Sequence, residues 1–207
     1  MIRVIFFSFI LILSGKLFSI DYPKEYNIKR IDSDFRTALG VNGLRRMHPH
    51  RGIDIKGPKD QPIIAIKDGT VLEVTTEKCW GPTIVIDHGK TFDNKNLIVL
   101  YGHVGETLVM KDDTVKRGDL IAKLPSSTRF RCMAGVRHLH LQINQKYRPL
   151  DQRTRKTAGG SLFVMDGKYP LNPHLYWARG KNKVSCFDSN LTYPKGTITY
   201  PFPCNKK

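Results

Sequence analysis

The stretch "PIIAIKDGTVLEVTTEKCWGPTIVIDHGK" (residues 62–90) gives the strongest indication of the fold class. It consists of short runs in which apolar residues alternate with others, rich in Ile, Val and Thr and broken by Gly, Asp and Pro. Successive side chains of a strand face opposite sides of a sheet, so this alternation is typical of half-buried strands separated by turns. Similar runs stand at 52–57 ("GIDIKG"), 96–104 ("NLIVLYGHV") and 119–125 ("DLIAKLP"). No sustained 3.6-residue period occurs between residues 50 and 146, and the sequence therefore predicts an antiparallel all-β domain.

Around this region the chain has 207 residues, of which 40% are hydrophobic, which suits one globular domain with a real core. "KYRPLDQRTRKTAGG" (146–160) is basic and turn-rich and indicates a loop or an insertion. "LFVMDGKYPLNPHLYW" (162–177) returns to strand character, with a hairpin turn expected at Asp166-Gly167. We expect one domain with a loop-rich C-terminal elaboration, preceded by a polar lead-in segment at 20–42.

The N-terminus predicts export. Arg3 is followed by an apolar run from Val4 to Leu13, which is too short to cross about 30 Å of hydrocarbon as a helix. We interpret residues 1–19 as a signal peptide cut near Ser19, with an uncleaved anchor as the alternative. After processing no transmembrane segment is expected, and the periplasm is the favoured location, with the cell wall or the extracellular space as the alternative.

The formal net charge is +16, and loss of the two cations of the signal segment leaves +14. Such a surface favours polyanions, and outside the cytoplasm anionic cell-wall polymers and acidic peptides are the expected partners; a role in solubility alone is the alternative. No aromatic stacking motif or zinc-finger spacing supports nucleic-acid binding. Four cysteines without a C-x-x-C pair suggest two disulfides. Three pairings exist, and proximity in sequence favours Cys79–Cys132 and Cys186–Cys204.

Five polar residues in three places can carry chemistry. His50 and Asp54 are four residues apart and can share one face, as an ion pair or as two ligands of a metal ion. His138 and His140 lie in "RHLHLQI", where positions i and i+2 of a strand point to the same side, and His103 ends the "LYGH" run. Two histidines and one carboxylate can hold Zn²⁺ with one position open for water, and further histidines can handle protons or a developing oxyanion.

In this order, "HRGID" (50–54), "YGH" (101–103) and "HLH" (138–140) resemble the three motifs of the lysostaphin/LytM-type zinc metallopeptidases, a family of bacterial peptidoglycan endopeptidases. The connecting segments "PIIAIKDGTV", "IVIDHG", "VKRGDLIAK" and "LHLQI" are also similar, over about residues 43–144. "LNPHLYW" (171–177) resembles the segment that closes many family domains. The resemblance implies an antiparallel β-sandwich or half-barrel of the duplicated hybrid-motif kind. The zinc peptidase domain would span 43–180 with an insertion at 145–170, and a disulfide-closed tail would span 181–207.

The resemblance also implies a site: one Zn²⁺ per chain held by His50, Asp54 and His140, with His103 and His138 acting in catalysis. Which of these two accepts the proton stays open. His48 competes with His50 as a ligand, but only His50 has an aspartate four residues on.

The implied function is a secreted endopeptidase that hydrolyses the peptide cross-links of peptidoglycan stems, with zinc-bound water as the nucleophile. A D-alanyl–diaminopimelate bond is preferred as the substrate, and a glycyl-glycine bridge is the alternative. An inactive cell-wall-binding or amidase-activating domain and a biotinyl- or lipoyl-type carrier domain are the other hypotheses. Retention of all five site positions argues against the first, and the lack of a lysine at a hairpin tip argues against the second. The oligomeric state stays open, and Asn42 with its neighbours in the lead-in is a candidate to block the site.

The remaining candidates receive structural interpretations. We expect His88 at a strand end or turn, His174 in a structural role and Tyr101 packed rather than catalytic. Arg45 and Arg46 precede the first motif, where they would either meet a substrate carboxylate or face solvent.

Overall fold

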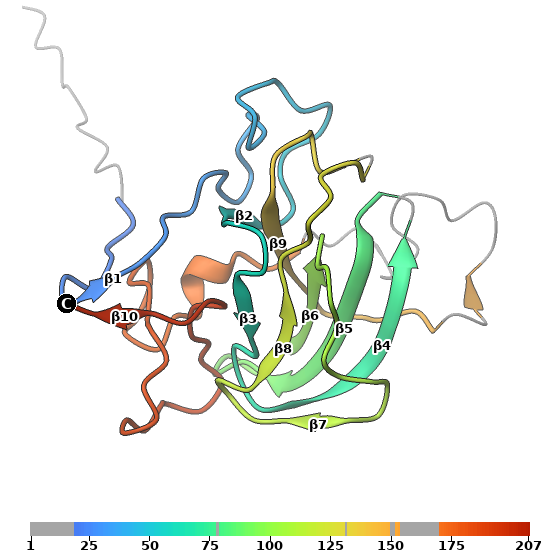
Figure 1. Ribbon diagram of the computed structural model, residues 1–207. Helices are drawn as coiled ribbons and strands as arrows, with labels where there is room; N and C mark the ends of the chain where they lie inside the picture. The colour runs from blue at the N-terminus through green and yellow to red at the C-terminus, as the bar shows by residue number, and fades with distance from the viewer. Residues whose placement is uncertain (1–18, 78, 131, 150–151, 154–169) are drawn as a thin grey trace, which may run out of the picture.

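A six-stranded antiparallel sheet is the centre of the molecule (Figure 1). The computed structural model describes residues 19–77, 79–130, 132–149, 152–153 and 170–207. The strand order in the sheet is β2-β9-β6-β5-β4-β7. The bounds are β2 Ile53–Lys56, β9 His138–Asn144, β6 Asn96–Gly102, β5 Gly81–Lys90, β4 Gly69–Glu77 and β7 Thr114–Val115. Each apolar-alternating run of the sequence forms a strand, which confirms the predicted antiparallel all-β class.

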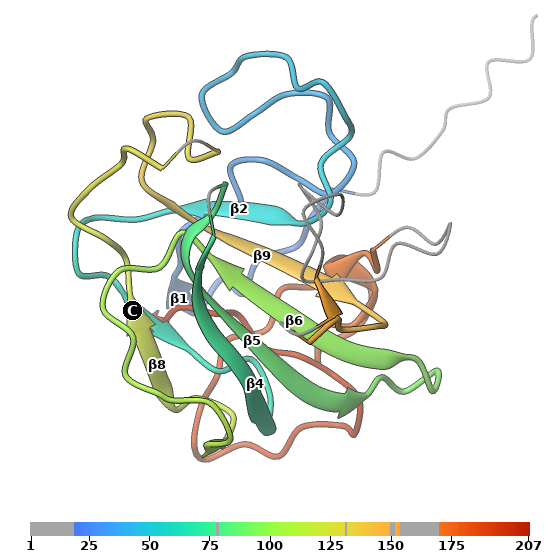
Figure 2. The ribbon, with the colours of Figure 1, turned by 90° about the vertical axis from the view of Figure 1, so that its right-hand side faces the viewer.

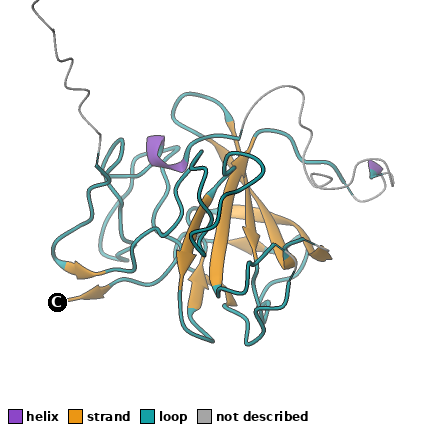
Figure 3. Cartoon of the chain, turned by 90° about the horizontal axis from the view of Figure 1, so that it is seen from above, coloured by secondary structure: helices purple, strands orange, loops and turns teal. Residues whose placement is uncertain are grey.

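Two short antiparallel pairs complete the strand content. β3 (Pro62–Ile64) pairs with β8 (Leu120–Lys123), and β1 (Tyr26–Asn27) pairs with β10 (Asn205–Lys206) near the two ends of the described chain. Pro173–Leu175 form a short 3₁₀ turn, labelled η3, and the described residues contain no α-helix (Figure 3). No helix among them is long and apolar enough to cross a membrane.

The alternation of the strands separates two faces of the sheet. On β9, Leu139, Leu141 and Ile143 are fully buried in the main core. This core lies between the sheet, the β3–β8 pair and the C-terminal chain, whose Trp177 and Tyr200 are among its largest members. The alternate residues of β9 face the other side, where a smaller cluster of Val85, Ile98 and Leu100 packs against Trp80 and Tyr147. The period of two in "HLHLQI" therefore places its polar side chains together on this second face.

The C-terminal tail is part of the folded core. Val184, Ile198 and Phe202 are buried in it, and the disulfide Cys186–Cys204 joins the two arms of the tail. A second disulfide, Cys79–Cys132, joins the β4–β5 turn to the loop before β9. Both favoured pairings are thus confirmed. Residues 1–18 of the predicted signal peptide (1–19) and the expected turn at Asp166-Gly167 lie outside the described residues.

The lead-in segment covers the free edge of β2. The backbone N–H groups of Asp32 and Ser33 donate to the carbonyl of Asp54 at 2.9 and 3.3 Å, and the N–H of Asp54 donates back to Ser33 at 2.9 Å. Unpaired edge strands are open to pairing with other chains, and this cover removes that edge. It also attaches residues 31–40 directly to the strand that carries Asp54.

Candidate metal centre

Strand register brings the predicted site residues together. Asp54 on β2 lies directly opposite His140 on β9, and His140 lies opposite Gly102 at the end of β6. His103 follows Gly102 and has a left-handed backbone, with a φ of 60°. This conformation costs free energy in a residue other than glycine, and it turns the His103 side chain out of the strand direction. His50 precedes β2 by three residues, and its ring returns to Asp54. Three strands thus converge their polar side chains at one end of the sheet.

His50, Asp54 and His140 form a buried cluster of ligand atoms. Asp54 Oδ1 lies 2.8 Å from His140 Nδ1 and 3.1 Å from His50 Nε2, and the two nitrogens are 3.1 Å apart. Ligand atoms of all three residues lie within 4.8 Å of one another. The three side chains are at most 8% exposed.

Outer hydrogen bonds fix which nitrogen of each ring faces the cluster. A backbone carbonyl can only accept, so His50 Nδ1–H donates to the carbonyl of Asp34 at 3.0 Å and leaves the lone pair of Nε2 directed inward. His140 Nε2–H donates to Gln142 Oε1 at 3.2 Å and leaves the lone pair of Nδ1 directed inward. Two lone pairs and one carboxylate oxygen thereby face one another, an arrangement that repels unless a cation lies between them. This donor set fits Zn²⁺, which takes imidazole nitrogen and carboxylate oxygen ligands.

His103 and His138 lie beside the cluster with the same arrangement. His103 Nδ1–H donates to the carbonyl of Trp80 at 3.0 Å, and His138 Nδ1–H donates to the carbonyl of Val136 at 2.7 Å. The two rings meet edge-on with their centroids 4.7 Å apart. His138 Nε2 lies 3.7 Å from Asp54 Oδ1. Both histidines therefore present a free Nε2 toward the same space as the three ligand candidates.

Burial and neighbouring groups set the protonation states of these side chains. Burial would raise the pKa of Asp54, but the adjacent imidazoles of His140 and His50 hold that pKa well below its usual value, so the carboxylate is ionised. Burial, together with the neighbouring His138 and His140, lowers the pKa of His103 to about 3. Burial also lowers the pKa of His50 and of His138, while Asp54 opposes the shift in both. These three imidazoles are therefore neutral at pH 7.

The second carboxylate oxygen of Asp54 accepts a hydrogen bond from Arg46. The Arg46 guanidinium donates to Asp54 Oδ2 at 2.5 Å and to Ser33 Oγ at 3.1 Å, and its Nε donates to the carbonyl of Leu39 at 3.2 Å. Arg46, whose side chain is 27% exposed, therefore binds the carboxylate of the site instead of lying free in solvent, and its contact with a substrate carboxylate stays a prediction. Its two roles are to orient Asp54 and to neutralise the oxygen that does not face the cluster. Arg45 is exposed.

Residues far along the chain support His50 through the lead-in segment. His174, in η3, binds the carboxylate of Asp34 with Nε2 to Oδ1 at 2.6 Å and accepts from Trp177 Nε1–H at 3.0 Å. Asp34 in turn offers its carbonyl to His50. His174 is buried and structural, as expected, and it links the C-terminal part of the core to the candidate ligand.

The other sequence-level candidates are also located. His48 is exposed whereas His50 is buried, which favours His50 as the ligand. His88 is a fully buried residue near the end of β5 and binds Tyr101 Oη through Nε2 at 3.0 Å. Tyr101 is packed in the core, as predicted. Asn42 lines a cavity of about 260 Å³ beside His138, and its side chain accepts from the backbone N–H of Leu44.

Sequence reasoning missed four supporting contributions: the guanidinium of Arg46, the carbonyl of Asp34, the amide of Gln142 and the ring of Trp80. Trp80 stacks on His140 with an interplanar angle of 13° and a centroid separation of 6.1 Å. Only Gln142 carried a signal, because residues i and i+2 of a strand share a face and Gln142 follows His140 at that spacing.

Comparison with known proteins adds the following findings. The model of peptidase family M23 matches residues 48–152, about half of the chain. An uncharacterized metalloprotease of Haemophilus influenzae is 31% identical over 141 residues, which cover 68% of this chain and 28% of that protein. The peptidoglycan DD-endopeptidase ShyA of Vibrio cholerae is 30% identical over 122 residues, which cover 59% of this chain and 26% of that protein. The chain thus spans little more than a quarter of the length of these relatives.

Similar solved structures include a zinc-containing peptidase from Vibrio cholerae, with 30% identity and a TM-score of 0.44 over 59% of this chain and 35% of that one. The catalytic domain of lysostaphin from Staphylococcus simulans has 17% identity and a TM-score of 0.46 over 72% of this chain and 89% of that one.

Proposed function

The chain belongs to peptidase family M23, and from this premise we propose that it is a zinc-dependent endopeptidase that hydrolyses peptide cross-links of bacterial peptidoglycan. The convergence of His50 Nε2, Asp54 Oδ1 and His140 Nδ1 within 4.8 Å carries the proposal. We assign one Zn²⁺ to these three atoms. When bound, Zn²⁺ would lower the pKa of a water molecule toward 7 and polarise the scissile carbonyl.

The chain's own residues handle the protons. We assign proton acceptance to His138, because its Nε2 lies 3.7 Å from Asp54 Oδ1 and the negative carboxylate stabilises an imidazolium at this position. The Val136 carbonyl holds the His138 ring through Nδ1–H, so the accepted proton resides on Nε2 and can pass to the leaving amine. His103, whose ring meets that of His138 edge-on, lines the same space and positions the reacting carbonyl.

We propose a D-alanyl–diaminopimelate cross-link as the substrate. The similarity to a relative named a peptidoglycan DD-endopeptidase supports this choice over a glycyl-glycine bridge. Two disulfides support a location outside the reducing cytoplasm, where peptidoglycan lies. The net charge of +16 suits an anionic wall.

The experiment is digestion of purified peptidoglycan by the mature protein, with products identified by mass spectrometry and zinc content measured in parallel. Chelation should abolish digestion, and added Zn²⁺ should restore it. His140→Ala should lose both zinc and activity, whereas His138→Ala should keep zinc and lose most turnover. His48→Ala, an exposed histidine two residues from His50, is the matched control and should change neither.

Three results would contradict the proposal. Digestion by His50→Ala or His140→Ala at the parent rate would remove the metal mechanism. Loss of zinc from His138→Ala would mean that the roles of His138 and His140 are exchanged. Release of glycine-terminated bridge fragments would replace the proposed substrate bond by the alternative.

A further inference from the structure

A second cavity, of about 670 Å³, lies at the opposite end of the sheet from the metal centre. β5 begins at Gly81, next to the Trp80 that stacks on His140, and ends at Lys90, which lines this cavity. Ten residues of extended strand span roughly 30 Å, so the cavity is separate from the candidate ligands. The β5–β6 turn and the C-terminal tail form two of its walls. Figure 2 shows the C-terminal chain passing below the end of β5.

The cavity is strongly cationic. Lys67, Lys90, Arg117 and Lys195 line it, and Asp68 is the only carboxylate among its described lining residues. Neutral groups hold three of the four cations. The Arg117 guanidinium donates to the carbonyls of Ile66 and Thr197 at 2.9 and 2.8 Å, Lys67 donates to a backbone carbonyl, and Lys90 donates to a side-chain amide. These contacts fix the positions of the cations without neutralising their charge, which leaves the cavity complementary to an anion.

Apolar and aromatic surface accompanies the charge. Phe92 is 61% exposed and Leu191 is 57% exposed, and both line the cavity. The ring of Tyr193 lies 4.6 Å from the Arg117 guanidinium carbon. A cavity that only held inorganic ions would gain nothing from exposed aromatic and aliphatic side chains, whereas a ligand with apolar faces as well as negative charge would contact both.

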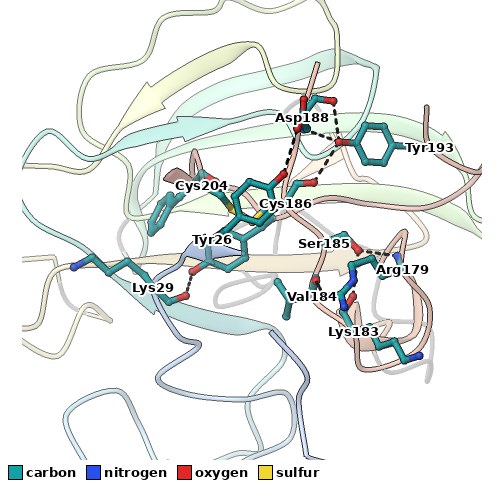
Figure 4. The surroundings of a disulfide bond; sticks show 12 residues. Tyr26, Lys29, Arg179, Lys183, Val184, Ser185, Cys186, Asp188, Tyr193 and Cys204 are labelled. Carbon is teal, nitrogen blue, oxygen red and sulfur yellow. Dashed lines mark hydrogen bonds between the residues drawn. A yellow bond between two sulfur atoms is a disulfide. The ribbon is translucent and has the colours of Figure 1, made fainter. Parts of the chain in front are cut away.

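The tail side of the cavity is built rigidly around the disulfide. Tyr193 Oη donates to the carbonyl of Cys186 at 3.2 Å and accepts from the N–H of Asp188 at 2.6 Å (Figure 4). The tail also packs closely against the β5–β6 turn, because a Cβ on Gly196 would lie 2.1 Å from the backbone nitrogen of Phe92. The two walls are therefore in direct backbone contact at this point.

We propose that this cavity binds an acidic saccharide unit, with the lysines paired to carboxylate groups and the ring of Phe92 against a sugar face. The ligand class follows from the charge and the aromatic surface together. This site goes beyond the proposed peptidase activity, because no residue of the metal centre contributes to it. It would hold the protein on an anionic glycan while the distant metal centre is free to act.

The experiment measures binding of a short oligogalacturonate to the full chain by titration calorimetry, with chelator present so that the metal centre is not involved. Lys90→Gln/Lys195→Gln should weaken binding by at least about tenfold, the loss expected when two charge-assisted contacts are removed. The matched control is Lys24→Gln/Lys111→Gln, which removes the same charge from exposed positions elsewhere and should change affinity by less than twofold. Phe92→Leu keeps an apolar side chain but loses the ring, and should weaken binding severalfold.

One further probe, inorganic polyphosphate, separates saccharide recognition from charge alone. Inorganic polyphosphate of matched charge should bind more weakly than the oligogalacturonate and should be insensitive to Phe92→Leu. Equal losses in the two lysine pairs, or polyphosphate binding as tight as that of the saccharide, would overturn the proposal in favour of a diffuse basic surface. Because all these measurements are of binding without turnover, their failure would not bear on the peptidase function, and failure of digestion would not bear on this cavity.

Discussion

Gln142 should control metal affinity although it is not a ligand. Its Oε1 accepts from His140 Nε2–H at 3.2 Å, and it is only 2% exposed, so water cannot take its place without rearrangement. Gln142→Met removes the acceptor and keeps an unbranched side chain of similar size. Loss of an outer hydrogen bond to a metal-binding histidine typically costs 10- to 100-fold in affinity, equivalent to about 1.4–2.7 kcal/mol. We expect zinc binding to weaken within that range.

The same substitution should also destabilise the zinc-free protein by about 1–3 kcal/mol. The reason is that the Nε2–H of His140 would be left buried and unpaired, and the Gln142 amide would no longer donate to Asn144 Oδ1. Gln142→Glu keeps the acceptor and should restore zinc affinity to the parent value or above.

Competition with a chromophoric zinc indicator gives the affinity, and urea unfolding with chelator gives the stability. Zinc affinity of Gln142→Met within twofold of the parent would refute the orienting role. A loss of stability alone would show that Gln142 serves only the packing of this face.

The remaining predictions concern stability. Burial lowers the pKa of His88 to about 3, so below pH 6.5 the unfolded state accepts a proton that the folded state does not. The contribution of His88 to the free energy of unfolding, measured with chelator, should therefore be complete above pH 6.5 and be lost as the pH falls toward 3. The free energy of unfolding of His88→Gln should fall less steeply over the same range. Replacing Cys186 and Cys204 together by serine, which opens a link of 18 residues, should cost about 3 kcal/mol in chemical denaturation; an unchanged midpoint would contradict this. Gly196→Ala should lower the melting temperature far more than Gly43→Ala, since both have positive φ but only the first Cβ meets backbone, and equal effects would show that no clash occurs.

Many features of this molecule can be predicted from local patterns in the sequence. Alternation of apolar residues with a period of two is a local property of the sequence. It located the main strands because successive side chains of a strand point to opposite faces of the sheet. The same local rule placed His138 and His140 on one face and Leu139 on the other. Order along the chain then grouped His50, Asp54 and His103 with them as site candidates, and sequence proximity favoured the two disulfide pairs.

Other features depend on which segments meet in space. The contact of Asp34 with His50 requires the lead-in to pair with the edge of β2, and the contact of Asp34 with His174 joins residues 140 positions apart. Arg46 shows the limit clearly, because a guanidinium in a basic run has no local pattern that distinguishes a solvent-facing side chain from one bound to a buried carboxylate.

The cationic cavity is the extreme case, since its lysines come from separate turns and its second wall from the tail. Local pattern and composition predicted the strands, the main chemical groups and the sign of the charge. The tertiary structure decided which nitrogen of each imidazole faces inward and where the charge gathers. Hydrogen-bond partners and fields depend on distances in space, which a one-dimensional pattern does not contain.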